Sequence, residues 1–295
     1  IPALAAVCRA QGVPLLVDNA HGAYLRFLPQ NCHPIAQGAA MCCDSAHKTL
    51  PVVTGGAYLH LAHDAPVQDE AAVRGALALF GSTSPSYLIL QSLDACNAVL
   101  AGDYPRRLAQ CCAALEGVRR SLNKAAAARQ CPVPLAVAGA QQEPMKLTLD
   151  AAALGCTGTA LADALRRAQL ECEYADPRYV VLMFTPENPP QDFERLQTAL
   201  EQLLAAVPAG LPRPESRAEE FAALQQQAVQ RCTIRQAVLG AQVRIPVHKA
   251  LGRVCAMPTV SCPPAIPVAV SGEEITPAAI ALMQRYGIEE LSVLR

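Results

Sequence analysis

The sequence lacks several features that would each define a class of protein. It has no run of about 18 apolar residues, so we expect no transmembrane helix and no membrane partner. No signal peptide is visible at the N-terminal end. There is no basic run and the formal net charge is only −1, which argues against a nucleic-acid or polyanion partner. No internal repeat or low-complexity tract is evident.

Cysteine is abundant, but its spacing matches neither a metal site nor a disulfide framework. The 13 cysteines include two adjacent pairs, Cys42-Cys43 and Cys111-Cys112, but no C-x-x-C motif. Their number is odd and several lie inside apolar runs, so we expect buried, reduced thiols in a cytoplasmic protein. Because no Cys/His group has the spacing of zinc ligands, no metal site is expected.

The composition is that of a globular protein with a large core. Of the 295 residues, 52% are hydrophobic and 17% are charged, which is enough for two or three domains. The first residue is Ile1 rather than Met, and the chain begins one helix before an expected mid-sheet strand. We therefore expect a fragment whose N-terminal portion is absent.

Two short apolar runs end in polar side chains. Residues 13–18 end at Asp18, which is followed by a small residue, a His and a Gly, and residues 39–43 are followed by Ser45, His47 and Lys48. Both runs read as buried parallel strands. Open α/β sheets bind ligands at the carboxyl ends of their strands, so these groups are expected to meet at one edge of a sheet.

A lysine and an aspartate at neighbouring strand ends suit pyridoxal 5′-phosphate (PLP). The Lys48 amine can form a Schiff base with an aldehyde, and a carboxylate such as Asp18 can keep the pyridine nitrogen protonated. Ser45 and His47 can donate hydrogen bonds to a phosphate, and Ala20 is small enough for a ring to lie flat on the backbone. Taken singly, these residues are more often a turn aspartate, a core histidine and a surface lysine. Their combination and order favour the cofactor site.

The two motifs resemble those of the Orn/Lys/Arg decarboxylase family of fold type I PLP enzymes. The matching residues are Asp18-x-Ala20-His21-Gly22 and Ser45-Ala46-His47-Lys48-Thr49-Leu50-Pro51, with supporting matches at residues 54–57, 81–87, 263–267 and 272–276. The resemblance implies that Lys48 holds PLP, that Asp18 faces the ring nitrogen, and that Ala20, His21, Ser45 and His47 lie beside the cofactor. It also implies that the phosphate loop and the ring-stacking residue precede this sequence.

The resemblance also implies an activity, a fold and an oligomer. The activity is decarboxylation of arginine, lysine or ornithine to the amine and CO₂, which feeds polyamine metabolism; the sequence does not distinguish the three substrates. We expect an α/β fold with a mostly parallel sheet, in a homodimer or larger homo-oligomer. Residues 1–104 would belong to the PLP-binding large domain, residues 105–212 to a small α+β domain, and residues 213–295 to a C-terminal decarboxylase-type α+β domain.

Several assignments have alternatives that the sequence leaves open. Thr83 and Ser84 suit the phosphate of a partner subunit's cofactor, or else a serine-rich helix cap before Tyr87. Glu273 and Glu274 suit the distal cation of a basic substrate, or else cap the helix that follows them. The protein could also be an aminotransferase or lyase of the same fold type, or a catalytically incompetent interaction subunit.

A departure from the family's pattern lies beside the proposed cofactor acid. Asn19 stands where the family commonly has Glu.

His60 and His63 follow a third expected strand and are expected to have structural roles.

Overall fold

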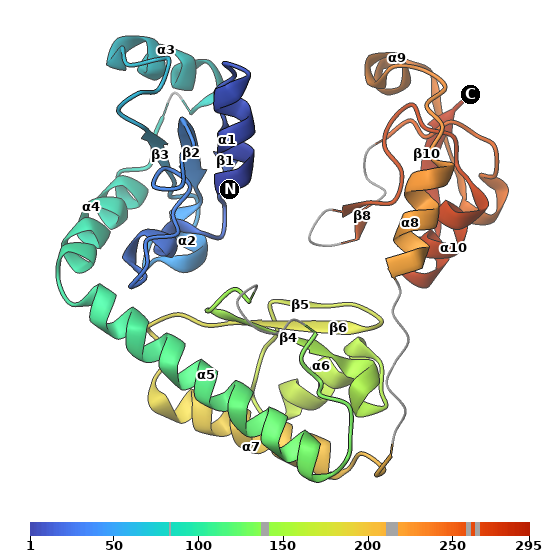
Figure 1. Ribbon diagram of the computed structural model, residues 1–295. Coiled ribbons are helices and arrows are strands. Elements are labelled where there is room, and N and C mark those ends of the chain that lie inside the picture. Colours follow the sequence, from blue (N-terminus) through green and yellow to red (C-terminus); the bar gives the residue numbers. More distant parts are fainter. Residues whose placement is uncertain (83, 137–141, 211–217, 258–260, 263–265) are drawn as a thin grey trace. The chain divides into compact units, whose positions relative to one another are not determined.

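The computed structural model covers residues 1–295 and describes all of them except 83, 137–141, 211–217, 258–260 and 263–265 (Figure 1). The chain divides into two compact units. Unit 1 comprises Ile1–Gly117 and Phe184–Phe193, and unit 2 comprises Val118–Met183 and Glu194–Arg295. Strands and helices alternate in the first part of the chain, so the expected α/β class is confirmed. The boundaries at residues 104 and 212 remain a prediction.

Unit 1 is built on a three-stranded sheet in the order β1-β2-β3. β1 (Leu16–Asp18) pairs in parallel with β2 (Met41–Asp44), and β3 (Tyr58–Leu61) pairs antiparallel with β2. The sheet was expected to be mostly parallel, but only the first pairing is. The chain leaves β2 through a single-turn helix and returns directly through Gly55 and Gly56, without the long crossover that a parallel partner needs.

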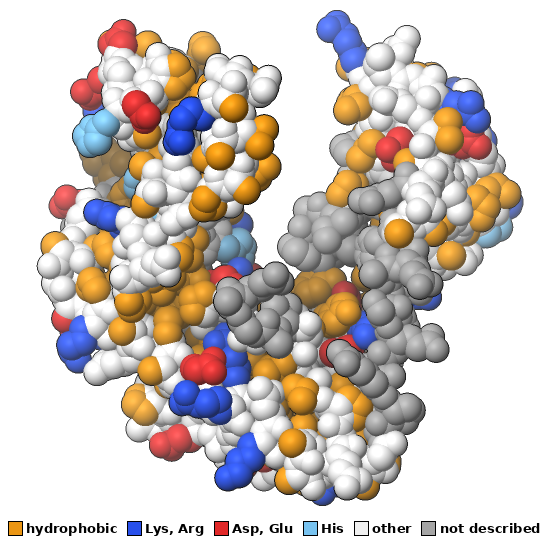
Figure 2. Space-filling view, viewed as in Figure 1, with side chains coloured by type: hydrophobic (Ala, Val, Ile, Leu, Met, Phe, Trp, Pro, Cys, Tyr) orange, Lys and Arg blue, Asp and Glu red, His pale blue; other side chains and the backbone are white. Residues whose placement is uncertain are grey.

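Unit 1 contains the helices that the apolar spacing predicts over residues 1–11, 67–80 and 86–100. It also contains two short helices that the sequence does not predict, one of them within residues 23–38, where a loop is expected. The helices are α1 (Pro2–Ala10), α2 (Ala46–Thr49), α3 (Glu70–Phe80) and α4 (Tyr87–Ala101), with a 3-10 helix at Ala23–Phe27. The carboxylate of Asp69 accepts a hydrogen bond from the Ala71 amide and so fixes the start of α3. Apolar side chains remain exposed on α1, α3 and α4, and Figure 2 shows orange side chains on the surface of the molecule.

The long helix α5 (Tyr104–Ala128) runs from unit 1 into unit 2. Its buried side chains include Leu108, Leu115, Val118 and Leu122, whose spacing is that of one helical face. Ser121 accepts a hydrogen bond from Gln197 of α7 (Pro190–Ala205), so within unit 2 the two helices lie side by side.

The middle of the chain forms an antiparallel sheet in the order β4-β6-β5. The strands are β4 (Lys146–Asp150), β5 (Tyr174–Ala175) and β6 (Tyr179–Met183), and α6 (Gly158–Arg167) packs against them. The sequence predicts a helix over residues 157–169 with Thr157 as its cap. The Thr157 hydroxyl accepts a hydrogen bond from the Ala160 amide, which confirms the cap. An added Cβ at Gly158 would collide with the Asp176 carbonyl, so only glycine fits at the first helical position.

The C-terminal part of unit 2 has its own apolar core. β7 (Gln242–Pro246) and β10 (Glu290–Leu294) pair antiparallel, and the buried side chains of Ile275 and Met283 lie in the same cluster as Leu291. The remaining elements are α8 (Ala218–Gln227), α9 (Ile234–Leu239), β8 (Ser261–Cys262), β9 (Ile266–Pro267) and α10 (Pro277–Arg285).

One expected strand in this part is misplaced, and one strand was missed. The short apolar run at residues 268–270 predicts a strand there. The strand is instead Ile266–Pro267, and Val268 and Ala269 are buried in the core without joining a ladder. A short apolar run in the sequence looks the same whether it forms a strand or is buried without strand pairing. β7 was missed because its partner, β10, lies more than forty residues away. In the described part of the chain, no helix is long and apolar enough to cross a membrane.

Candidate functional site

The carboxyl end of β1 presents three of the predicted site residues. Asp18 ends the strand and pairs in register with Cys43 of β2. Its exposed carboxylate accepts a hydrogen bond from the Ala20 amide at 3.1 Å. The Asn19 amide donates to the Cys43 carbonyl at 2.9 Å, which extends the parallel ladder by one residue. The turn carrying Ala20 and His21 therefore starts from a fixed strand end.

The carboxyl end of β2 presents the other three residues of this edge. Ser45 is at the N-cap position of α2, but its side chain makes no capping hydrogen bond, so the hydroxyl remains available to a ligand. The Lys48 amide donates to the Ser45 carbonyl at 3.0 Å, and the half-buried Lys48 side chain has no ion pair in the described residues.

His47 is held by the loop that leads to β3. Its ring Nδ1 lies 2.9 Å from the Gly56 carbonyl oxygen, and its backbone amide donates to the same oxygen at 3.2 Å. A carbonyl only accepts, so Nδ1 carries the proton and donates. This arrangement fixes the imidazole and leaves Nε2 as the atom that can meet a substrate or a cofactor.

The predicted residues of the two motifs therefore meet at one edge of one sheet. Parallel strands β1 and β2 carry them at adjacent carboxyl ends, which is where open α/β sheets bind ligands. The residues concerned are Asp18, Ala20, His21, Ser45, His47 and Lys48. The fold brings them together, whereas their chemical roles remain predictions.

The serine-rich segment is only partly described. Thr83 lies outside the described residues, and Ser84 is exposed, with its amide donating to Ser82 Oγ at 3.1 Å. Ser86 is at the N-cap position of α4 but makes no side-chain capping hydrogen bond. A cap on α4 therefore does not explain this segment in the part of the chain that is described, and contact with a partner's phosphate remains a prediction.

Glu273 and Glu274 have partners within their own unit. Glu273 Oε2 accepts a hydrogen bond from the Val270 amide at 2.9 Å, and Glu274 Oε2 forms an ion pair with Arg231 at 2.6 Å. The alternative that they cap α10 is wrong, because the Thr276 hydroxyl accepts the hydrogen bond from the Ala279 amide. They belong to unit 2 and Lys48 to unit 1, so their role toward a substrate remains a prediction.

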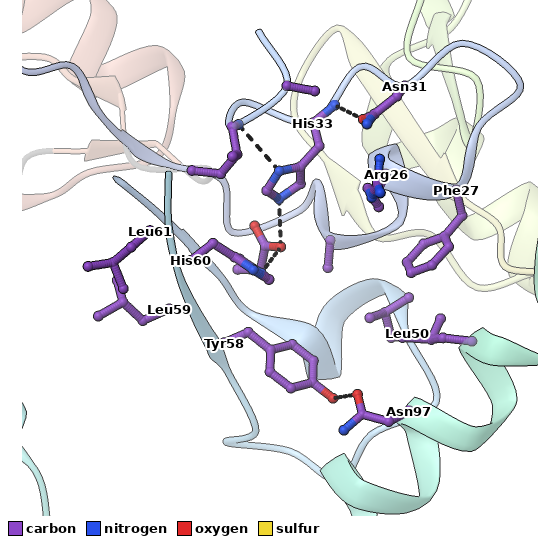
Figure 3. Close-up of a pocket in the computed structure, with 15 residues that line it drawn as sticks. Arg26, Phe27, Asn31, His33, Leu50, Tyr58, Leu59, His60, Leu61 and Asn97 are labelled. Carbon is purple, nitrogen blue, oxygen red and sulfur yellow. Dashed lines mark hydrogen bonds and ion pairs between the residues drawn. The ribbon is translucent and has the colours of Figure 1, made fainter. Parts of the chain in front are cut away.

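The sequence did not predict a cluster around Asp44 at the end of β2. Asp44 Oδ2 lies 3.0 Å from His33 Nε2 and 3.0 Å from His60 Nε2, while Asn19 Nδ2 donates to Oδ1 at 2.8 Å. Figure 3 shows the two imidazoles directed at one carboxylate. Burial alone would raise the pKa of Asp44, but the hydrogen bonds from the two histidines and Asn19 hold that pKa well below its usual range.

The cluster lines a cavity of about 650 Å³ in unit 1. Its lining also includes the apolar side chains of Phe27, Leu50 and Leu61, and Tyr58 reaches Asn97 of α4 with its hydroxyl at 3.1 Å (Figure 3). None of the predicted cofactor residues lines this cavity. It is therefore separate from the edge that carries Asp18 and Lys48.

The cysteines for which the structure describes a state are free thiols. Burial, with Asp44 nearby, raises the pKa of the Cys42 thiol to about 12, and burial raises the pKa of Cys111 to about 12 as well. Such thiols stay protonated at neutral pH and behave as small apolar side chains.

Solved structures define the class to which this fold belongs. A lysine decarboxylase from Francisella novicida superposes with a TM-score of 0.69 at 17% identity, covering 95% of this chain and 53% of that one. The constitutive lysine decarboxylase of E. coli gives 0.68 at 16% identity, covering 96% and 55%. The chain therefore shares its fold with these two lysine decarboxylases.

Sequence comparison finds similarity to one enzyme family. Residues 4–142 match the family model described as the Orn/Lys/Arg decarboxylase major domain. The arginine decarboxylase of Bacillus subtilis (strain 168) is 29% identical over 272 residues, which are 90% of this chain and 54% of that protein. Over this segment the chain is similar to the Orn/Lys/Arg decarboxylase family. It spans about half the length of the curated relatives it matches.

The residues at the sheet edge fit the cofactor that the family implies. PLP needs a lysine amine for its aldehyde, a carboxylate for its ring nitrogen and hydrogen-bond donors for its phosphate. Lys48 is partly buried and has no ion pair in the described residues, the Asp18 carboxylate is exposed, and the Ser45 hydroxyl makes no capping bond. Asp18 accepts only one hydrogen bond from the described residues, which leaves a carboxylate oxygen for a ring nitrogen.

Proposed function

We propose that the protein is a PLP-dependent decarboxylase that converts a basic amino acid (arginine, lysine or ornithine) to its amine and CO₂. The observation that carries the proposal is that Asp18 and the turn with Lys48 follow adjacent carboxyl ends of parallel strands, in a chain whose residues 4–142 match this family's model. The Bacillus subtilis relative is named an arginine decarboxylase and the structural neighbours are lysine decarboxylases. Those names support the reaction class rather than one substrate.

The residues at the sheet edge share the tasks of the proposed reaction. PLP, when bound, supplies an electron sink for the bond that breaks at the substrate α-carbon. The Lys48 amine holds the cofactor, and the Asp18 carboxylate keeps the ring nitrogen protonated by charge pairing. The Ser45 hydroxyl would donate a hydrogen bond to a phosphate oxygen, and the small Ala20 side chain would leave room for a flat ring.

His47 and Lys48 are the candidates for returning a proton to the α-carbon. Because His47 Nδ1 is committed to the Gly56 carbonyl, Nε2 is the atom that would carry the transferred proton. The Lys48 side chain, when its nitrogen is free and protonated, would be the second candidate donor. We propose Glu273 and Glu274 as the acidic partners of the substrate's distal cation; the existing ion pair of Glu274 with Arg231 would have to open for this.

We also propose that the protein acts as a homo-oligomer, in the cytoplasm and in polyamine metabolism. Large apolar side chains next to the 81–86 segment support self-association: Phe80 is 93% exposed and Tyr87 is 86% exposed. In an oligomer, Thr83 and Ser84 would contact the phosphate of the neighbouring subunit's cofactor.

Product identity tests the proposal against its alternatives. Purified protein with PLP would be incubated separately with arginine, lysine and ornithine, and CO₂, amine and keto acid would be measured. Equal amounts of amine and CO₂ from one substrate support the decarboxylase. Keto acid without CO₂ identifies an aminotransferase, and no turnover of any substrate supports a catalytically silent subunit. Lys48→Ala should abolish the product, whereas Lys124→Ala, which changes an exposed lysine on α5, should not.

A further inference from the structure

One hydrogen bond joins Asn19, the second residue of the first cofactor motif, to Asp44, which precedes the second motif. Asn19 directly follows Asp18, and Asp44 directly precedes Ser45. Asn19 Nδ2 donates to Asp44 Oδ1 at 2.8 Å across the β1–β2 pair. This bond lies at the point where both strands end, beyond the regular ladder, so it fixes how the two terminal turns are set against each other.

The Asn19 side chain has little freedom to move. An added Cβ at Gly22 would collide with the Asn19 amide, so this side chain packs directly on the glycine backbone. The Gly22 amide also donates to the Asn19 carbonyl at 2.8 Å, closing the turn that contains Ala20 and His21. Asn19 is therefore held on one side by its own turn and on the other by Asp44.

Two histidines hold the Asp44 carboxylate at Oδ2, the oxygen that Asn19 does not contact. Asp44 is 2% exposed, and the Nε2 atoms of His33 and His60 both lie 3.0 Å from its Oδ2. An ionised carboxylate only accepts hydrogen bonds, so each Nε2 must carry a proton and donate. The Cys42 thiol faces Oδ1 at 3.5 Å as a further titratable neighbour.

His33, Asp44 and His60 could also form a metal site, because their ligand atoms lie within 4.8 Å of one another. The surroundings of His33 favour the donor role. Its Nδ1 faces the Ile35 amide N–H at 3.4 Å, which requires an acceptor at Nδ1 and hence a proton on Nε2. A metal on Nε2 would need the opposite tautomer, with two N–H groups facing each other.

We propose that Asp44 is a positioning residue of the cofactor site, and that it aligns the turn after Asp18 with the Ser45–Lys48 turn through Asn19, while His33 and His60 hold it as hydrogen-bond donors. The inference rests on the proposed function. It also accounts for the amide at position 19. Glu, which the family commonly has there, would set a second carboxylate against Asp44, whereas Asn supplies a donor.

Four variants and one control test the proposal. Asp44→Asn removes the charge and keeps the shape of the side chain. Asn19→Asp places a second carboxylate against that of Asp44. Asn19→Ala removes the donor alone. The double variant Asn19→Asp/Asp44→Asn exchanges the two groups, so that the amide introduced at position 44 can donate to the carboxylate introduced at position 19 and still accept from both histidines. Asp64→Asn, which changes an exposed carboxylate in the same unit, is the matched control. The dissociation constant of PLP and the absorption maximum of the bound cofactor are measured, together with the denaturation midpoint.

The positioning role predicts a specific pattern. The dissociation constant of PLP should rise about tenfold or more in Asp44→Asn and Asn19→Asp, less in Asn19→Ala, and return to within about threefold of wild type in the exchanged double variant. The absorption maximum should shift in the two single charge variants and return in the exchanged one. Asp64→Asn should leave all three measurements unchanged.

Three results would overturn the inference, each for a different reason. Wild-type protein that binds no PLP contradicts the proposed function and the positioning role with it. PLP binding that is unchanged in Asp44→Asn, or an exchanged variant no better than Asp44→Asn, contradicts the positioning role alone. A visible Co²⁺ spectrum that disappears in His33→Ala and His60→Ala would identify the histidines as metal ligands instead of donors.

Discussion

Asp18 and Cys43 are partners in the parallel ladder of β1 and β2, and this register brings the Asp18 carboxylate to the sheet edge from which Ser45, His47 and Lys48 continue. Thirty residues of sequence separate the acid from the lysine, but only one strand pairing separates the elements that carry them. The proposed chemistry depends on this register, because a slip of one residue would turn Asp18 to the other face of the sheet.

Asp18→Asn should lower activity without unfolding the protein. The asparagine oxygen can still accept the hydrogen bond from the Ala20 amide, and position 18 is exposed, so the unfolding midpoint should not change. The charge that keeps the cofactor nitrogen protonated is lost, and kcat should fall by about 10²–10³. Steady-state CO₂ release measures the effect. A rate equal to that of the Asp64→Asn control would rule out a role for Asp18 at the ring.

Two substitutions at His47 separate its structural contact from its chemistry. In His47→Asn the side-chain amide can still donate to the Gly56 carbonyl, while Nε2 is lost; His47→Ala loses both. If Nε2 transfers a proton, both variants should lose about 10²–10⁴ in kcat, and only the alanine variant should also lose stability. If the asparagine variant keeps wild-type activity, His47 acts only by holding the loop.

The acid sensitivity of the protein should depend on Asp44. Its folded pKa is lowered, so its contribution to stability is complete above the ordinary value of 3.8 and is lost as the pH falls below that value. Asn19, His33, His60 and Cys42 are the groups that face it. The difference in unfolding free energy between wild type and Asp44→Asn should be nearly constant just above about pH 4, where Asp44 is ionised in both the folded and the unfolded protein. It should then shrink by up to about 1.4 kcal/mol per pH unit.

Urea unfolding at a series of pH values measures this difference. The exposed carboxylate of Asp64 provides the control, because Asp64→Asn should leave the pH dependence of wild type in place. Parallel curves for wild type and Asp44→Asn down to about pH 2 would show that Asp44 is not held as a charged hydrogen-bond acceptor.

A mostly buried ion pair stabilises the middle sheet of unit 2. Arg178 Nη2 lies 2.7 Å from Asp150 Oδ2, and the two side chains are 11% and 12% exposed. Arg178→Ala leaves a buried carboxylate and should cost about 3 kcal/mol of unfolding free energy. Asp150→Asn/Arg178→Met should recover part of this loss, because the amide oxygen introduced at position 150 can still accept from the Ala152 amide.

Chemical denaturation of these variants is compared with an exposed pair. Glu70 and Arg74 on α3 are both 77% exposed, so Arg74→Ala should cost less than about 0.5 kcal/mol. A loss in Arg178→Ala as small as that in Arg74→Ala would contradict the stabilising role of the buried pair.

Local signals in the sequence predicted the elements and the sheet edge. The helix start at Thr157 was predicted because a cap is a bond between neighbours in the chain, and the ends of β1 and β2 were predicted because an apolar run stops at polar groups. These signals depend on residues a few positions apart. The same locality explains why the starts of β1 and β2 were placed two to three residues too early.

The parts that were missed depend on pairings between distant residues. β7 is a strand only because β10 closes against it, and Asp44 is a buried anion only because His33, Asn19 and His60 reach it from three other segments. None of these spacings forms a recognisable motif. The strand predicted at residues 268–270 is wrong for a related reason: Val268 and Ala269 are buried, but an apolar run does not by itself determine whether its backbone joins a ladder.

The lysine to which PLP attaches can be identified by mass spectrometry. The chain has four lysines, at positions 48, 124, 146 and 249. Protein loaded with equimolar PLP would be reduced with borohydride and digested, and the labelled peptide would be identified by mass spectrometry. The account predicts label on Lys48, present in Lys124→Ala and absent from Lys48→Ala. Label on one of the other three lysines, or a wild-type protein without label, would contradict it.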